Sequence, residues 1–375
     1  MKQSDYSEIS PVDLKNPFRN PTEAPDYTPD YREILPTLDM PDCRLPLIPQ
    51  TNERNALRRC FALTFLMLLF AFVTSAAIYV ILQTGVTFAL QQIDQHRLGE
   101  LPENYPMIVR QFLNDSSINS ALTLISFTIG NLSAFLIGCR LTHLRKNDLF
   151  RLRDLSGIRT AAYILLGLWI QLLTGYAVTY ITGFCESAGI PVHAQEFALN
   201  GSIPKTAVIV LYVCLLAPIT EELLLRGFAL KNLSRVSQRF GILLTALLFG
   251  LMHENIPQLI FTVPLGVLLA YITIRHNSLT PAIITHIAVN SAAMLLEYGR
   301  LMLPTRTFRT ADMLYTMLVL LLGTVALFYM LLTEQMPDLT PHQSARSKRL
   351  VMTAPLFWVL IVVHLGVTLF AAYLL

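Results

Sequence analysis

Charged residues are scarce in this chain. Asp, Glu, Lys and Arg together make up 14% of its 375 residues, whereas a soluble domain carries about 25%. The hydrophobic share is 53% and the mean hydropathy is +0.51. This shortage of charge excludes an ordinary soluble domain, and a net charge of only +3 without a basic block argues against a nucleic-acid-binding surface. The composition predicts a membrane protein.

Cysteines are few and irregularly spaced. None of the five forms a CxxC pair, and most lie in or beside apolar segments; they are Cys43, Cys60, Cys139, Cys185 and Cys214. This pattern supports neither a disulfide framework nor a zinc knuckle. The opening residues MKQSDYSEIS contain no apolar run, so we expect no cleavable signal peptide.

Residues 1–55 differ in composition from the remainder. They hold nine of the 21 prolines, many acidic and polar residues, and little apolar periodicity. Such a segment buries too little apolar surface to offset the entropy lost on folding. We therefore expect a disordered, proline-rich tail.

Beyond the tail, apolar runs of about 20 residues, the length that crosses a bilayer, alternate with short polar breaks. We expect spans at 60–83, 118–139, 160–184, 205–230, 240–254, 257–274, 279–298, 312–333 and 354–375. The run at 240–254 is short, so the count is eight or nine. Segment 84–117 is mixed in charge and is expected to be an extramembrane loop with some interfacial helix. The fold class is all-α, a polytopic membrane helical bundle.

Basic residues indicate the orientation of the bundle. They cluster before the first span and after the second, fourth, sixth and eighth, and they are sparser in the alternate loops apart from 299–311. Because cytoplasmic loops carry an excess of Lys and Arg, the N-terminus is expected to be cytoplasmic, and with nine spans the C-terminus lies outside.

The stretch APITEELLLRGF, residues 217–228, places three ionisable groups inside an apolar run. Glu222 and Arg226 are four residues apart with the acidic residue first, the favoured order for a pair on one helical face. Glu221 is rotated by about 100° from Glu222 and can face elsewhere. We expect Arg226 to hold Glu222 and leave Glu221 available for chemistry.

Two further pairs with a spacing of four follow, Phe249 with His253 and His286 with Asn290. Each pair shares a helical face. A charge inside the bilayer costs roughly 2.5–3.5 kcal/mol, so packing alone is a weak explanation for such residues. From their depths in the expected helices, Glu221, His253 and His286 are expected to meet in a cavity that opens toward the cytoplasm.

Pro218 precedes the two glutamates. Proline lacks an N–H, so the hydrogen bond to the carbonyl of Cys214 is lost. We expect the helix to bend there around a cavity.

These polar residues admit three interpretations. They form a structural salt-bridge network, they line a pathway for an ion or solute, or they carry out catalysis. Transporters of many folds contain internal repeats, and the sequence shows none.

Three motifs point to a family. EELLLR, FGLMH and HIAVN occur in this order within residues 205–298 and match the EExxxR, FxxxH and HxxxN/D motifs of the CPBP family. This family comprises type II CAAX prenyl endopeptidases and abortive-infection intramembrane proteases, including bacteriocin-immunity and lysostaphin-resistance proteins. The chain resembles this family over about a quarter of its length. The resemblance implies a CPBP-type catalytic core at 201–300. The apolar runs outside it predict N-terminal transmembrane helices at 56–200 and C-terminal transmembrane helices at 301–375.

The resemblance also implies an activity and residue roles. The interior cavity would cleave peptide bonds, with Glu221 activating a water molecule that His253 helps to hold. His286 and Asn290 would donate hydrogen bonds to the oxyanion of the tetrahedral intermediate. The residues that would orient the catalytic groups are Glu222, Arg226 and Phe249.

Two mechanisms remain open. A glutamate-dependent reaction without a cofactor is favoured, because no HExxH motif is present and Asn290 is a poor zinc ligand. The alternative is a His₂Glu zinc site formed by Glu221, His253 and His286.

The expected partners are the lipid bilayer and a membrane-associated peptide or protein that enters laterally or from the cytoplasmic side. Two other classes of function stay open, a non-catalytic immunity or scaffold protein and a transporter with a polar pathway. Glu254 is expected to be a helix-end residue, and His364 a packed or hydrogen-bonded residue of the last span.

Overall fold

The computed structural model describes residues 49–115, 117–142, 144, 149–150, 156–189, 203–235, 238–333 and 351–374. Within these ranges the chain forms helices joined by short turns, and no strand is present. The expected all-α membrane bundle is confirmed. The proline-rich segment up to residue 48 lies outside the described residues, and the first described helix begins at Pro49, inside the segment predicted as tail.

In chain order, the helical elements are α3 (Pro49–Leu98), α4 (Tyr105–Asp115), α5 (Ser117–Leu141), α6 (Gly157–Ser187), α7 (Ile203–Leu211), η3 (Tyr212–Leu216), α8 (Ala217–Glu222), η4 (Leu223–Leu230), α9 (Lys231–Leu233), α10 (Gln238–Leu251), α11 (Ile256–His276), α12 (Thr280–Met302), α13 (Thr305–Thr333) and α15 (Pro355–Leu374). Each of the nine apolar runs expected to span the membrane is mainly helical.

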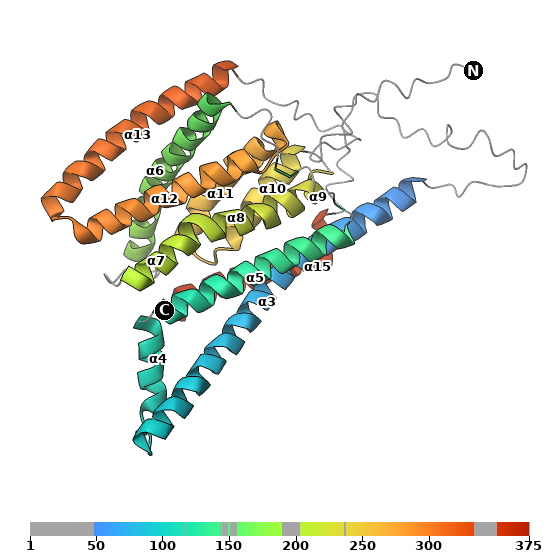
Figure 1. Cartoon of the computed structure of the whole chain (residues 1–375). Helices are drawn as coiled ribbons and strands as arrows, with labels where there is room; N and C mark the ends of the chain where they lie inside the picture. The colour runs from blue at the N-terminus through green and yellow to red at the C-terminus, as the bar shows by residue number, and fades with distance from the viewer. Residues whose placement is uncertain are drawn as a thin grey trace, which may run out of the picture.

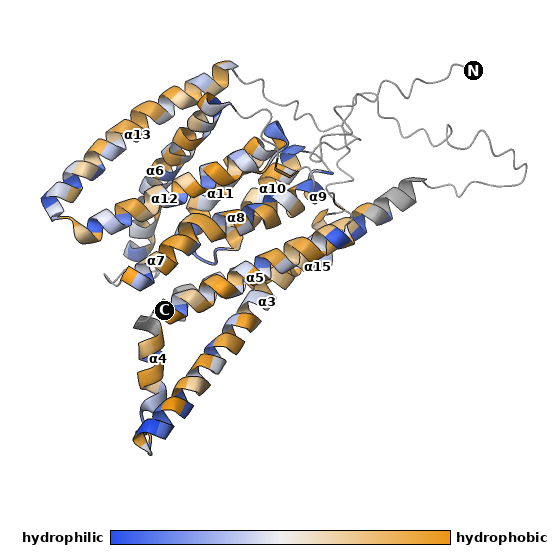
Figure 2. Cartoon of the chain, viewed as in Figure 1, coloured by the Kyte–Doolittle hydropathy of each residue, from blue (hydrophilic) through white to orange (hydrophobic). Residues whose placement is uncertain are grey.

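Six helical stretches in the described part of the chain are long and apolar enough to cross a membrane. They are Leu57–Leu98, Ser117–Leu141, Gly157–Ser187, Ile203–Leu233, Ile256–His276 and Thr305–Thr333. Figure 2 shows the hydrophobic residues along the helices in orange. α10 and the stretch Pro355–Phe370 are apolar but shorter. The protein is therefore an integral membrane protein, while eight or nine spans remains a prediction.

The region expected to be a loop from residue 84 is mostly helical. α3 continues to Leu98 and ends only at Gly99, whose φ of +79° is accessible to glycine at little cost. No proline stops the helix between 84 and 101, and polarity alone does not end one. α4 then packs back onto α3, and the Tyr105 hydroxyl donates to Asp94 Oδ2 at 2.8 Å.

The helices fall into two groups that flank the chain from 203 to 302. α3, α5 and α15 lie together on one side, with α6 and α13 on the other (Figure 1). α3 and α5 approach closely at Gly130, where a Cβ would lie 2.9 Å from the Ala71 carbonyl oxygen. Between these groups, α7, α8 and η4 contact α5, while α11 and α12 contact α6.

Two apolar clusters hold this arrangement together. One joins α3, α5, η4, α10, α11, α12 and α15, and the other joins α6, α11, α12 and α13. α11 and α12 contribute to both clusters, which makes them the shared central layer. Tight packing across this layer restricts where its few polar side chains can lie.

Candidate active site

The helix that carries the two glutamates is irregular. Two π-helical stretches, η3 and η4, flank the short α8, and Pro218 lies at the start of α8. Cys214, whose carbonyl cannot accept a bond from Pro218, lies within η3, while the expected bend of the helix stays a prediction. π-helical turns inside α-helices are frequent at functional sites. The carbonyl of Val213 in η3 accepts a hydrogen bond from Asn290 Nδ2 at 2.9 Å.

Glu222 and Arg226, which are four residues apart, form the predicted ion pair in the core. Arg226 Nη1 lies 2.7 Å from Glu222 Oε1, and both side chains are fully buried. Arg226 Nη2 also donates to the carbonyl of Gly266 at 3.3 Å. The guanidinium lies 4.5 Å from the centroid of the Phe249 ring, an arrangement that adds cation–π attraction. These contacts tie α8 and η4 to α10 and α11.

Phe249 lies at the centre of the histidine pair. Its side chain is 1% exposed, and its ring meets those of His253 and His286 edge to face, with centroids 4.9 and 5.6 Å apart. Together with the guanidinium, Phe249 therefore contacts three functional groups. A bulky, rigid ring in this position restricts the orientations of both imidazoles.

His286 links the two glutamates. Its Nδ1 lies 3.0 Å from Glu222 Oε1, and since a carboxylate accepts, Nδ1 is the donor. Its Nε2 lies 3.9 Å from Glu221 Oε2. Nε2 can donate a hydrogen bond only when the ring carries both protons. Glu222 is fully buried, whereas the Glu221 side chain is 21% exposed and faces the cavity.

His253 lies just beyond the end of a helix, contrary to the expectation that the helix continues to residue 254. α10 ends at Leu251, and the next helix begins at Ile256 with Asn255 as its N-cap, which accepts from the Gln258 amide at 3.1 Å. The capping residue and the proline at 257 begin a new helix, so the preceding one must stop. His253 Nδ1 donates to the Phe249 carbonyl at 2.7 Å, which leaves Nε2 as its other nitrogen.

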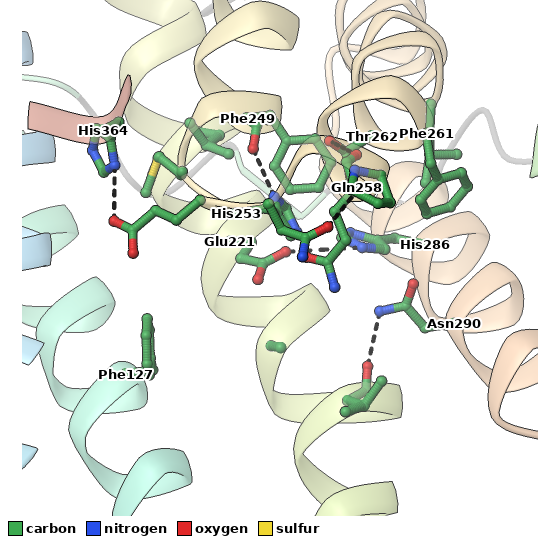
Figure 3. A pocket seen from close by; sticks show the side chains of 18 of the residues that line it. Phe127, Glu221, Phe249, His253, Gln258, Phe261, Thr262, His286, Asn290 and His364 are labelled. Carbon is green, nitrogen blue, oxygen red and sulfur yellow. Dashed lines mark hydrogen bonds and ion pairs between the residues drawn. The ribbon is translucent and has the colours of Figure 1, made fainter. Parts of the chain in front are cut away.

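At least one polar residue from each of the three motifs lines one cavity of about 900 Å³. Figure 3 shows the side chains of Glu221, His253 and His286 gathered in it, with Asn290 beside them. Glu222 and Arg226 lie behind this wall and do not line the cavity. The structure thus brings together residues that are up to 69 positions apart in the sequence.

Several cavity residues have no counterpart in the motifs. They come from helices on every side of the site and include Asn131, Gln171, Gln258, Thr262 and His364. Neither spacing nor composition distinguishes these residues from other polar residues of the apolar runs. Only the packing of α5, α6, α11 and α15 around the glutamate helix brings them to the site.

The zinc alternative has no preformed site here. Within the part of the chain that the structure describes, no three His, Cys, Asp or Glu side chains are grouped closely enough to hold a metal ion. Glu221, His253 and His286 share a cavity without forming a coordination set. We therefore derive no chemical step through a metal.

Comparison with known proteins gives one match. Residues 203–292 match the family model described as type II CAAX prenyl endopeptidase Rce1-like. The chain carries an Rce1-like domain. This result confirms the resemblance to the CPBP and CAAX proteases. Searches among curated proteins and among solved structures found no match.

The Rce1-like domain runs from the start of α7 into α12 and covers 90 of the 375 residues. It includes all the residues of the three motifs. α3, α4, α5 and α6 precede it, and α13 and α15 follow it. The family supports a membrane-embedded protease, and elements outside the domain complete the cavity wall.

Proposed function

We propose that this protein is an intramembrane endopeptidase that hydrolyses peptide bonds of membrane-associated substrates. One observation carries the proposal: inside the Rce1-like domain, Glu221, His253, His286 and Asn290 line a single cavity within a bundle of apolar helices. A carboxylate, an imidazole and an amide around one cavity can act as base, water holder and hydrogen-bond donor.

In the proposed reaction, Glu221 removes a proton from a water molecule as the water oxygen attacks the peptide carbonyl carbon. His253 Nε2 accepts a hydrogen bond from this water and orients it. The tetrahedral intermediate then collapses, the C–N bond breaks, and the proton from Glu221 passes to the leaving nitrogen. The products are a carboxylic acid and an amine, which become a carboxylate and an ammonium ion when the acid proton passes to the amine, and no cofactor is consumed.

The oxyanion needs donors, and two side chains are placed to supply them. Asn290 Nδ2 donates one of its two hydrogens to the Val213 carbonyl, and the second can be donated to a ligand. His286 donates through Nε2 when both of its nitrogens are protonated, with Glu222 accepting from Nδ1. The buried Glu222–Arg226 pair would keep His286 in this orientation.

The proposed orientation follows from the loops. Basic residues cluster before the first span and after every second span, which favours a cytoplasmic N-terminus. A substrate would therefore enter from the cytoplasmic side or laterally from the bilayer. The substrate would be a peptide or protein held at the membrane.

His253→Ala tests the role of the water-holding imidazole. We expect kcat to fall by about 10²-fold, since a misplaced water reacts slowly, while substrate binding changes little. Cleavage of a panel of membrane-anchored peptides by purified protein in micelles, with and without chelator, gives the measurement. Wild-type activity in the variant would contradict the role. Loss of wild-type activity with chelator, restored by zinc, would overturn the metal-free mechanism.

The charge of the cavity predicts a substrate preference. Its described lining contains two carboxylates, Glu221 and Glu254, and no lysine or arginine. At an effective dielectric constant of 20, two like charges about 10 Å apart repel by about 1.7 kcal/mol. Peptides with Asp beside the scissile bond should therefore have kcat/KM values about tenfold below those of matched Asn peptides. Lys and Gln peptides form the control pair, and equal rates for Asp and Asn would contradict the prediction.

A further inference from the structure

A second acid–histidine contact lies in the wall of the same cavity, outside the three motifs. Glu254 directly follows His253 in the turn between α10 and α11. Its φ is +54°, in the left-handed region that residues other than glycine seldom adopt. The Glu254 side chain is 25% exposed and lines the cavity.

The partner of Glu254 comes from the last helix. His364 of α15 is 2% exposed, and its Nδ1 lies 3.1 Å from Glu254 Oε1, so Nδ1 donates to the carboxylate (Figure 3). The His364 ring also meets Phe72 of α3 edge to face, with centroids 5.1 Å apart. The expectation of a packed or hydrogen-bonded histidine thus agrees with the structure.

The turn that carries His253 is held locally by hydrogen bonds from the His253 amide to Gly250 at 3.2 Å and from the Glu254 amide to Leu251 at 3.1 Å. His253 Nδ1 also bonds to the Phe249 carbonyl at 2.7 Å. None of these bonds holds the Glu254 side chain. A left-handed glutamate persists only where its surroundings hold it. The contact with His364, 110 positions away, supplies such a restraint from a helix outside the Rce1-like domain.

We propose that His364 is a positioning residue: by binding Glu254 it holds the His253–Glu254 turn and keeps the His253 imidazole directed at the reacting water. This proposal rests on the proposed peptidase activity, in which His253 orients water. α15 then belongs to the catalytic unit, although it contributes no group that touches the substrate peptide bond. His364 is only 2% exposed, so its donor is difficult to replace by bulk solvent.

The kinetic test compares three variants in the purified full chain. His364→Phe removes the donor, and we expect kcat to fall about 10- to 100-fold, with KM within about threefold of wild type. His364→Asn keeps an amide N–H near the position of Nδ1 and should restore kcat to within about threefold. His276→Phe removes another partly buried histidine, which is bonded to Tyr163 at 2.8 Å and does not line the cavity, and should leave kcat within about threefold.

A double-mutant cycle separates the contact from general damage to α15. Glu254→Ala should lower kcat as much as His364→Phe, and the double variant should show no additional loss. Additive losses would overturn the proposal, as would equal losses in His364→Phe and His364→Asn. A raised KM with an unchanged kcat in His364→Phe would overturn it as well.

Hydrogen–deuterium exchange gives a readout that does not depend on activity. Peptides covering residues 250–256 should exchange faster in His364→Phe and at the wild-type rate in His364→Asn. Unchanged exchange in His364→Phe would refute the positioning role. If Glu221→Gln cleaves as well as wild type, the proposed catalysis fails, and the exchange result still decides whether His364 holds the turn.

Discussion

Replacing Glu221 with glutamine is expected to lower kcat by about 10⁴-fold, the upper end of what a general base contributes. The amide keeps the shape of the side chain but cannot take a proton from water. Glu221 is partly exposed to the cavity, and its closest polar contact is with His286 at 3.9 Å. The fold should therefore remain unchanged, and single-turnover cleavage of the peptide panel measures the effect.

Glu297→Gln is the matched control for this substitution. It neutralises a carboxylate on α12 that pairs with Arg300 at the surface and does not line the cavity. Its kcat should equal that of the wild type. Equal cleavage by wild type and Glu221→Gln would remove Glu221 from the mechanism, and the proposed function would then lose its base.

Replacing Arg226 with leucine is expected to lower the free energy of unfolding by about 3–5 kcal/mol, because Glu222 would remain as a buried charge without its cation. Both side chains are fully buried, so water cannot take the place of the guanidinium. The cation–π contact with Phe249 is lost as well. Denaturation by SDS titration in mixed micelles, followed by circular dichroism, measures the change.

A second substitution distinguishes lost charge balance from lost packing. Glu222→Gln retains an oxygen for His286 Nδ1 and removes the charge, so adding it to Arg226→Leu should recover about 2 kcal/mol. Arg226 Nε and Glu222 Oε2 have no hydrogen-bond partner among the described residues, so the ion pair itself is incompletely satisfied. A double variant less stable than Arg226→Leu would contradict this explanation.

The surface pair Arg300–Glu297 provides the control for stability. It has a spacing of three on α12, and the Arg300 side chain is 51% exposed. Arg300→Leu should change the free energy of unfolding by less than about 1 kcal/mol, since solvent screens exposed pairs. A loss comparable with that of Arg226→Leu would show that burial is not the source of the larger effect.

Local patterns in the sequence were sufficient for the helices and for the pair within one helix. Apolar runs of membrane-spanning length specify helices because the bilayer requires every backbone group to bond within its own segment. The spacing of Glu222 and Arg226 determines their contact, since residues four apart meet on one helical face. The three motifs were sufficient to predict the Rce1-like family.

Helix ends were less predictable. α3 extends to Leu98 because the polar residues that follow its apolar part are still helical. A prediction based on charge therefore ends this helix too early. α10 ends before His253 because Asn255 and the proline at 257 begin α11, a capping signal that a hydropathy reading overlooks. At both helix ends the local residues contained the signal, but a prediction based on hydropathy alone missed it.

Local sequence patterns were enough for the helical membrane fold, the Rce1-like domain at 203–292 and the Glu222–Arg226 pair, because each helix, motif and pair involves residues within a few turns of chain. Depth along the expected helices was enough to predict that Glu221, His253 and His286 meet in one cavity. Which other helices complete the cavity wall, and that α15 places His364 on Glu254, emerged from the tertiary structure. Those contacts join distant segments, and they arise from how whole helices pack around α11 and α12. Pairwise spacing within one segment contains no information about that packing.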